Sequence, residues 1–247
     1  MRSGRKNQPP VLKTLDRVLS KAGLASRTEA RKWIGAGRVQ VNGKLIQTPD
    51  KWIDLDRDKV TLDGKPIRAE KKMYLLLYKP KGFITTRKDP EGRPTVYDLM
   101  PELGKWVVPV GRLDLDTSGL ILMTNDTQFA EHVMNPERKV SKTYLVKASK
   151  LLTNQELEQL RQGVMLSDGP TQPAEVKRIR DSEKYSFIEL TIREGRNRQV
   201  RRMIESLGAK VLKLVRTRIG PLEISDLPIG KYRELRPDEV KYLLSNR

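Results

Sequence analysis

The sequence of 247 residues predicts an α+β fold in two parts. Segments with strand patterns outnumber the helical ones and do not alternate with them as βαβ units would. That arrangement is typical of a mixed, mostly antiparallel sheet flanked by helices. Basic charge is concentrated early in the chain: residues 1–72 hold 18 Lys and Arg against 8 Asp and Glu, and residues 73–247 hold 31 against 23. We therefore expect a small basic module ahead of a larger body.

The module is predicted to consist of two helices followed by a hairpin. Apolar residues recur at helical spacing over 12–22, and a capping box over 26–29 begins a second helix. The dipeptide Asn42-Gly43 predicts a type I′ turn between two short strands. Basic side chains gather along the second helix and its end, and such a basic edge suits the phosphates of a nucleic acid: Arg27, Arg31, Lys32 and Arg38.

The larger body is predicted to alternate irregularly between strands and capped helices. Alternating or continuous apolar patterns predict strands over 73–78, 106–110, 121–124, 143–148, 174–179, 188–192 and 211–215. Helical patterns with start and stop residues predict helices over 127–134, 153–163 and 200–207, with a last helix starting at Pro237.

Composition narrows the possible partners and chemistry. The net charge of +18 favours a polyanion, nucleic acid before an anionic membrane. The absence of Cys excludes disulfides, thiolate nucleophiles and zinc sites of the Cys type. No apolar run approaches the roughly 18–20 residues that span a bilayer, and the N-terminus lacks the apolar segment of a secretory signal. We expect a cytoplasmic protein without membrane association, with a disordered basic leader over 1–11.

The segment 111–120, Gly-Arg-Leu-Asp-Leu-Asp-Thr-Ser-Gly-Leu, places Asp114 between a glycine and a hydroxyl-rich turn. Its local features leave two interpretations open. Asp114 either caps backbone N–H groups in a turn, or it is an ionised nucleophile beside Arg112 on the same face of a strand. Asp116 completes an Asp-x-Asp pair that suits Mg²⁺, but no glycine-rich phosphate loop accompanies it. We therefore expect no metal.

Five arginines lie within 193–202, at the start of a predicted amphipathic helix. Such a run is usually a solvated basic face, yet arginines at a helix N-terminus after a glycine also form an anion site. Arg198 and Arg201 lie on the flanks of the apolar face, so either side chain can reach inward. Tyr144, at the head of a predicted strand, is on its own features either core filler or a cross-strand partner.

Several separated motifs, in order, resemble the RsuA/RluB-type pseudouridine synthases. Residues 13–60 resemble the alpha-L RNA-binding domain first described in a small-subunit ribosomal protein. Residues 77–82 resemble the opening strand and turn of the family, and 111–120 its catalytic motif. Lys142-Thr143-Tyr144 resembles the motif of the active-site tyrosine, and 194–203 the motif of a basic residue that pairs with the catalytic aspartate. The resemblance implies an alpha-L domain over 12–69 and a catalytic domain over 70–247.

The resemblance also implies roles for individual residues. Asp114 is expected to be the nucleophile of uridine isomerisation, Tyr144 to stack on the target base and take a proton, and Arg201 to pair with Asp114. Arg112 is expected to hold the loop and Leu214 to form part of the apolar wall. Further RNA contacts are expected from Arg196, Arg198 and Arg202. The reaction imports no group and oxidises nothing, so no cofactor is expected.

The expected partner is ribosomal RNA or a ribosome-assembly intermediate, bound by a monomer. Residues 88–95 resemble the branch that modifies large-subunit 23S rRNA, which we favour, whereas 230–235 fit the branch that modifies 16S rRNA equally well. Two other hypotheses remain: an RNA-binding assembly factor without chemistry, and a glycosidase-type enzyme on nucleic acid, which requires two facing carboxylates.

Overall fold

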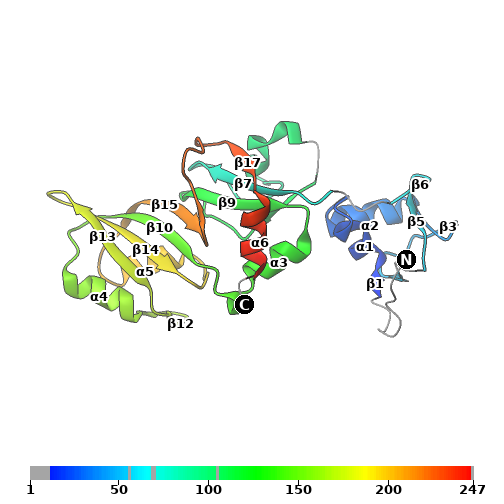
Figure 1. Cartoon of the computed structure of the whole chain (residues 1–247). Coiled ribbons are helices and arrows are strands. Elements are labelled where there is room, and N and C mark those ends of the chain that lie inside the picture. Colours follow the sequence, from blue (N-terminus) through cyan, green and yellow to red (C-terminus); the bar gives the residue numbers. More distant parts are fainter. Residues whose placement is uncertain (1–11, 55–56, 68–70, 104–105, 246–247) are drawn as a thin grey trace. The chain divides into compact units, whose positions relative to one another are not determined.

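The computed structural model describes residues 12–54, 57–67, 71–103 and 106–245, so the expected leader over 1–11 lies outside the described residues. The chain divides into two compact units (Figure 1). The first comprises the residues up to Lys72 with two short segments from later in the chain, and the second comprises the remainder. No helix in the described ranges is long and apolar enough to cross a membrane.

The first unit contains the two predicted helices, α1 (Leu15–Lys21) and α2 (Arg27–Gly35), which share an apolar core with the strands. Asn42 and Gly43 both have positive φ, so the predicted type I′ turn is present. Helix α1 begins later than predicted because residues 13 and 14 extend and pair with another strand. The strands are β1 (Lys13–Thr14), β2 (Val39–Val41), β3 (Lys44–Leu45), β4 (Trp52–Ile53), β5 (Val60–Leu62) and β6 (Lys65–Pro66).

The second unit is built on one large, mostly antiparallel sheet. Its main strand order is β13 (Glu175–Asp181), β14 (Ser186–Ile192), β10 (Lys142–Ala148), β15 (Val211–Ile219), β9 (Ser118–Thr124), β7 (Tyr74–Lys79) and β17 (Tyr232–Glu234). β8 (Val108–Val110) pairs with β9, and β16 (Leu222–Glu223) pairs with β15. Of the ladders described in this sheet, that between β9 and β15 is parallel and the others are antiparallel. This sheet with its helices confirms the predicted α+β class.

The parallel ladder depends on Gly119. It lies opposite Arg216 with a φ of +115°, and a Cβ on it would collide with the backbone of Arg216. Only glycine combines that conformation with so close an approach of two strands.

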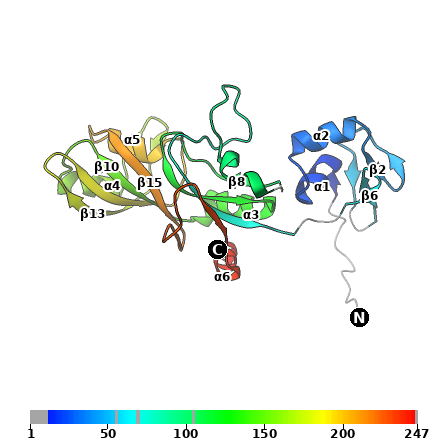
Figure 2. The same cartoon turned by 90° about the horizontal axis from the view of Figure 1, so that it is seen from above.

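Helices cover parts of the sheet. α3 (Thr127–Met134) and α6 (Pro237–Ser245) contribute apolar side chains to a core that they share with β7 and β9 (Figure 1). α4 (Asn154–Gln162) begins at the predicted capping box, and α5 (Gln199–Glu205) contacts β15. Short elements complete the unit: η1 (Val96–Leu99), η2 (Pro101–Leu103), η3 (Pro136–Arg138), β11 (Met165–Leu166) and β12 (Gly169–Pro170). Figure 2 shows the loop between β7 and η1 projecting from the unit.

Candidate active site

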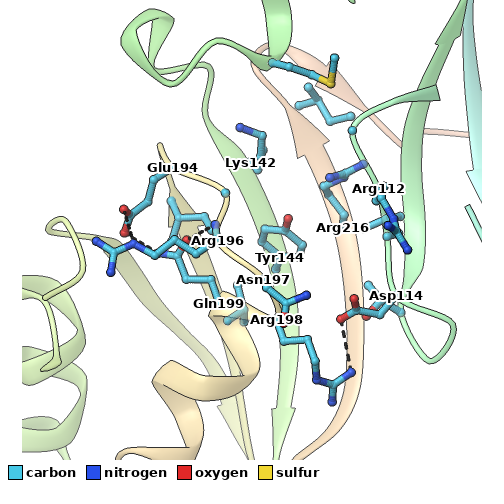
Figure 3. Close-up of a pocket in the computed structure, with 18 of the residues that line it drawn as sticks. Arg112, Asp114, Lys142, Tyr144, Glu194, Arg196, Asn197, Arg198, Gln199 and Arg216 are labelled. Carbon is cyan, nitrogen blue, oxygen red and sulfur yellow. Dashed lines mark hydrogen bonds and ion pairs between the residues drawn. The ribbon is translucent and has the colours of Figure 1, made fainter. Parts of the chain in front are cut away.

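A cavity of about 470 Å³ lies between the loop after β8, the loop before α5, and strands β10 and β15 (Figure 3). Most of the residues that the sequence marked in the second unit line it: Arg112, Asp114, Tyr144, Arg196, Arg198, Arg201 and Leu214. Arg202 is not among its lining residues. The fold therefore brings together side chains that are up to 102 positions apart in the sequence, from Arg112 to Leu214.

The loop that carries Asp114 leaves the sheet at Gly111, which has a φ of +81°. Residues 112–117 are not in a strand, and the side chain of Asp114 is 33% exposed beside the cavity. The sequence predicted that Arg112 and Asp114 share one face of a strand. That prediction is wrong, because Gly111 turns the chain out of the sheet. Arg112 is exposed within the loop.

A buried lysine at the end of β7 holds this loop. Lys79 Nζ donates to the carbonyl oxygens of Asp114 at 3.0 Å, Thr117 at 2.7 Å and Pro80 at 3.1 Å. Burial lowers the pKa of Lys79 to about 8, although the charges of Asp114 and Asp116 oppose that shift. These bonds fix the backbone on both sides of the Asp114 carboxylate.

Two arginines from the start of α5 face the carboxylates of this loop. Arg198 Nη1 lies 3.5 Å from Asp114 Oδ2 and 3.5 Å from Asp116 Oδ1. Arg198 adopts a φ of 47°, a conformation uncommon for residues other than glycine and frequent at functional sites. Arg201 Nη2 lies 3.0 Å from Asp116 Oδ2, and Arg201 Nε lies 4.0 Å from Asp114 Oδ2.

These ion pairs bear on the possible magnesium site. Asp114 and Asp116 each already have two arginine partners, which suits an anionic nucleophile more than a cation ligand. Over the described part of the chain, no cluster of three or more His, Cys, Asp or Glu side chains could hold a metal ion.

The floor of the cavity is the junction of β10 and β15. Tyr144 is 8% exposed and lies directly opposite Arg216 in the antiparallel ladder. Leu214 is two residues from Arg216 and is also buried. A largely buried aromatic ring beside an aliphatic side chain provides a surface on which a flat heterocycle can stack.

Two arginines expected to bind RNA also contact the β11–β12 hairpin. Arg202 makes two bonds to the carboxylate of Asp168, at 2.8 and 3.0 Å, and this hydrogen bonding lowers the pKa of Asp168. Arg196 donates to the carbonyl oxygen of Gly169 at 3.0 Å and to Glu194 at 3.2 Å. Both guanidinium groups thus have strong partners within the protein.

In the first unit, a buried carboxylate positions two of the basic side chains. Arg27 and Arg31 each lie 2.9 Å from Asp16 Oδ2. Burial acts to raise the pKa of Asp16, but hydrogen bonds from Thr14, Arg31 and Arg27 together lower it to about 2. Both arginines keep about half of their side-chain surface in solvent, so they remain accessible to phosphates.

The other two basic residues are also partly held. Arg38 pairs with Asp63 at 2.5 Å and lies 5.1 Å from the ring centre of Trp33. Lys32 is exposed, with its Nζ 3.9 Å from Glu29 Oε2.

Sequence reasoning missed three residues of the site, namely Lys79, Asp116 and Arg216. Lys79 directly follows an apolar run, and Arg216 lies two residues after Leu214. A charged residue directly after a predicted strand was the available signal in both cases. Asp116 was considered as one half of a magnesium-binding pair and lies in a turn. The two arginines that face it, Arg198 and Arg201, are distant in sequence.

Comparison with known proteins identifies the family. A model of RNA pseudouridylate synthases matches residues 73–206, which include the Asp114 loop, Tyr144 and both arginines that face Asp114. The chain belongs to the RNA pseudouridylate synthase family. An S4 domain model matches residues 13–51, within the first unit.

Relatives of this RNA pseudouridylate synthase align along nearly the whole chain. It is 41% identical over 234 residues to ribosomal large subunit pseudouridine synthase B of Bacillus subtilis, an alignment that covers 94% of this chain and 96% of the relative. It is 36% identical to an uncharacterized RNA pseudouridine synthase of Aquifex aeolicus, covering 93% and 92%. A crystal structure of a pseudouridylate synthase, 31% identical, superposes with a TM-score of 0.68 over 93% of this chain and 99% of that one. The predicted RsuA/RluB-type membership and isomerase class are confirmed.

Proposed function

We propose that this protein isomerises uridine to pseudouridine in 23S rRNA of the large ribosomal subunit, with Asp114 as the nucleophile. The observation that carries the proposal is the placement of Asp114 beside a cavity that also contains Tyr144, on a loop fixed by Lys79. The choice of the large subunit rests on the relative from Bacillus subtilis, whose name assigns it to that subunit.

The chemistry requires few groups. Asp114 forms an ester bond to C1′ as the N1–C1′ bond breaks, and the electron pair of that bond leaves on the base. The detached base turns, C5 attacks C1′, and the Asp114 carboxylate leaves as the C5–C1′ bond forms. The proton on C5 is then lost, and N1 finishes with a proton. The target must first leave its stack, at a cost of a few kcal/mol, and the Tyr144 ring with Leu214 replaces part of that stacking. Tyr144 takes the C5 proton as its hydroxyl gives up its own, which balances the proton that N1 gains, and Arg198 and Arg201 balance the charge beside Asp114.

The first unit supplies affinity for folded RNA. Its half-exposed arginines contact phosphates, so binding weakens steeply as salt rises. We propose that the protein acts in the cytoplasm as a monomer, on rRNA or a ribosome-assembly intermediate.

Pseudouridine mapping in a strain that lacks the gene tests this function. We expect one or a few positions of 23S rRNA to lose the modification, and a plasmid copy of the wild-type gene to restore it. Loss of a 16S position instead would assign the enzyme to the small subunit. If the pseudouridine maps of both rRNAs are unchanged and the purified protein is inactive on both, the remaining hypothesis is an RNA-binding assembly factor without catalytic activity.

A further inference from the structure

Two cationic side chains lie on the cavity floor beside Tyr144. Arg216 is the cross-strand partner of Tyr144, and Lys142 precedes Tyr144 by two residues on β10. All three line the cavity, and Figure 3 shows Lys142 above the Tyr144 ring and Arg216 to its right. Neither cation takes part in the bond changes of the proposed reaction.

Both cations are shielded from solvent, and neither has an acidic partner within the described residues. Arg216 is 4% exposed; its Nε donates to the carbonyl oxygen of Leu120 at 2.6 Å, while its buried Nη2 has no hydrogen-bond partner within the described structure. Lys142 is partly buried, and its Nζ donates to the carbonyl oxygen of Val140 at 3.2 Å. Burial lowers the pKa of Lys142 to about 8, with the charge of Arg216 acting in the same direction.

The acidic side chains of the cavity are occupied elsewhere. Asp114 faces Arg198 and Arg201, and Glu194 pairs with Arg196. No ion pair of the described residues reaches Lys142 or Arg216. Two like charges withdrawn from water without a counter-charge are costly, so this end of the cavity favours a ligand that brings negative charge.

The proposed reaction generates such a charge at this place. When the N1–C1′ bond breaks, the electron pair that leaves on the base is shared with its O2 and O4 carbonyl oxygens. A base that stacks on Tyr144 has its edge beside the two cations. We propose that Lys142 and Arg216 bind the carbonyl edge of the target uracil and stabilise the negative charge that develops on it. This inference rests on the proposed isomerase function and adds two catalytic residues to it.

An RNA phosphate is the competing occupant of this position. Phosphates stay near solvent when a nucleotide enters a pocket, whereas Arg216 lies buried on the floor beside the ring that would hold the base. The two occupants differ in what they predict. A charge that exists only during the reaction affects the rate, whereas a phosphate contact affects RNA affinity and its salt dependence.

The test is Lys142→Met in the full-length protein, assayed on an rRNA fragment that the wild type modifies. We expect the single-turnover rate at saturating RNA to fall about 10²–10³-fold, as for loss of one charge-stabilising donor, with the RNA Kd within about threefold of wild type. Lys142→Arg should recover most of the rate because it keeps the charge. The control is Lys147→Met on the same strand, because Lys147 lies over Tyr185 and is not among the lining residues of the cavity.

The outcomes separate the possibilities. An unchanged rate for Lys142→Met overturns the inference, as does a weaker Kd with a wild-type rate at saturation, which would indicate a phosphate. If Lys142→Met no longer melts cooperatively, Lys142→Gln is assayed in its place. The inference then stands only if Lys142→Arg recovers most of the single-turnover rate that Lys142→Gln loses. A wild-type protein that forms no pseudouridine would instead contradict the proposed function itself.

Discussion

Arg201 is bound more closely to Asp116 than to Asp114. Its Nη2 lies 3.0 Å from Asp116 Oδ2 and also donates to the Asp116 carbonyl oxygen at 3.1 Å, whereas its Nε is 4.0 Å from Asp114 Oδ2. The Arg201 side chain is 7% exposed, so this pairing is largely shielded from solvent. The two aspartates therefore have different tasks: Asp116 fixes Arg201, and Asp114 remains on the cavity side with weaker contacts.

The first prediction concerns Asp114. Asp114→Asn removes the proposed nucleophile but keeps the size of the side chain, so we expect the single-turnover rate to fall by at least about 10³-fold. RNA affinity should stay within about threefold of wild type, as measured by filter binding at fixed salt. Pseudouridine formed at near the wild-type rate by this variant would show that the nucleophile is another group.

Asp116→Asn is predicted to have a smaller effect. Arg201 loses the closer of its two ion pairs, and weaker pairing of this buried cation costs about 1–3 kcal/mol, so the melting temperature should fall. The rate should drop about tenfold to a hundredfold because the loop beside Asp114 loosens while the nucleophile remains. A variant as inactive as Asp114→Asn, yet equally stable as wild type, would assign Asp116 a direct part in the chemistry.

Gly119→Ala is predicted to weaken the parallel ladder. The new Cβ would collide with the backbone of Arg216 at a positive φ, and we expect a loss of about 2 kcal/mol or more in urea unfolding. Gly111→Ala is the matched control, because Gly111 also has a positive φ but a Cβ added there would meet no atom within 4 Å. It should cost only about 1 kcal/mol from backbone strain. Equal losses in the two variants would argue against the steric cause.

Lys79→Met tests how the loop is held. The carbonyl oxygens of Asp114, Thr117 and Pro80 lose their donor, and we expect the rate to fall about 10²-fold through misplacement of the carboxylate. Methionine keeps the apolar stem but cannot bond these oxygens, so a rate near that of wild type would remove Lys79 from the positioning of Asp114.

The same substitution has a pH-dependent effect on stability. The pKa of Lys79 is about 8 in the folded protein, below its ordinary value of 10.5. A lysine whose pKa is lower in the folded state than in the unfolded state adds to the free energy of unfolding. This stabilisation is fully present above the unfolded pKa and is lost as the pH falls through the folded pKa. The free energy of unfolding of wild type minus that of Lys79→Met should therefore rise between pH 8 and 10.5, as measured by urea melts. A difference that stays constant or falls contradicts this linkage.

Local signals were sufficient to predict most elements. The helix at 127–134 and the hairpin turn at 42–43 are where spacing and turn chemistry placed them. Strand β15 ends at Ile219, four residues later than the predicted strand over 211–215. Its second half has no local apolar pattern and is held in the sheet by pairing with β10 and β16. Strand length there is decided by partners distant in sequence.

The site itself was harder to predict from residues alone. Asp114, Tyr144 and Arg201 were marked by motifs, but Lys79 and Arg216 are charged residues buried in strands, where an apolar pattern predicts neither. Their functions depend on which carbonyl oxygens and side chains face them, and that follows from the order of the strands in the sheet.

The parallel ladder between β9 and β15 also has a consequence for the timing of biosynthesis. Arg216 pairs with β9, the strand that follows the Asp114 loop. The Asp114 loop leaves the ribosome well before Arg216, because residues 125–210 are synthesised between β9 and β15. Contacts of such long sequence separation form late in folding. A nascent chain that ends before β15 thus has the carboxylate but only part of the cavity floor, and the site is complete only after β15 has been synthesised.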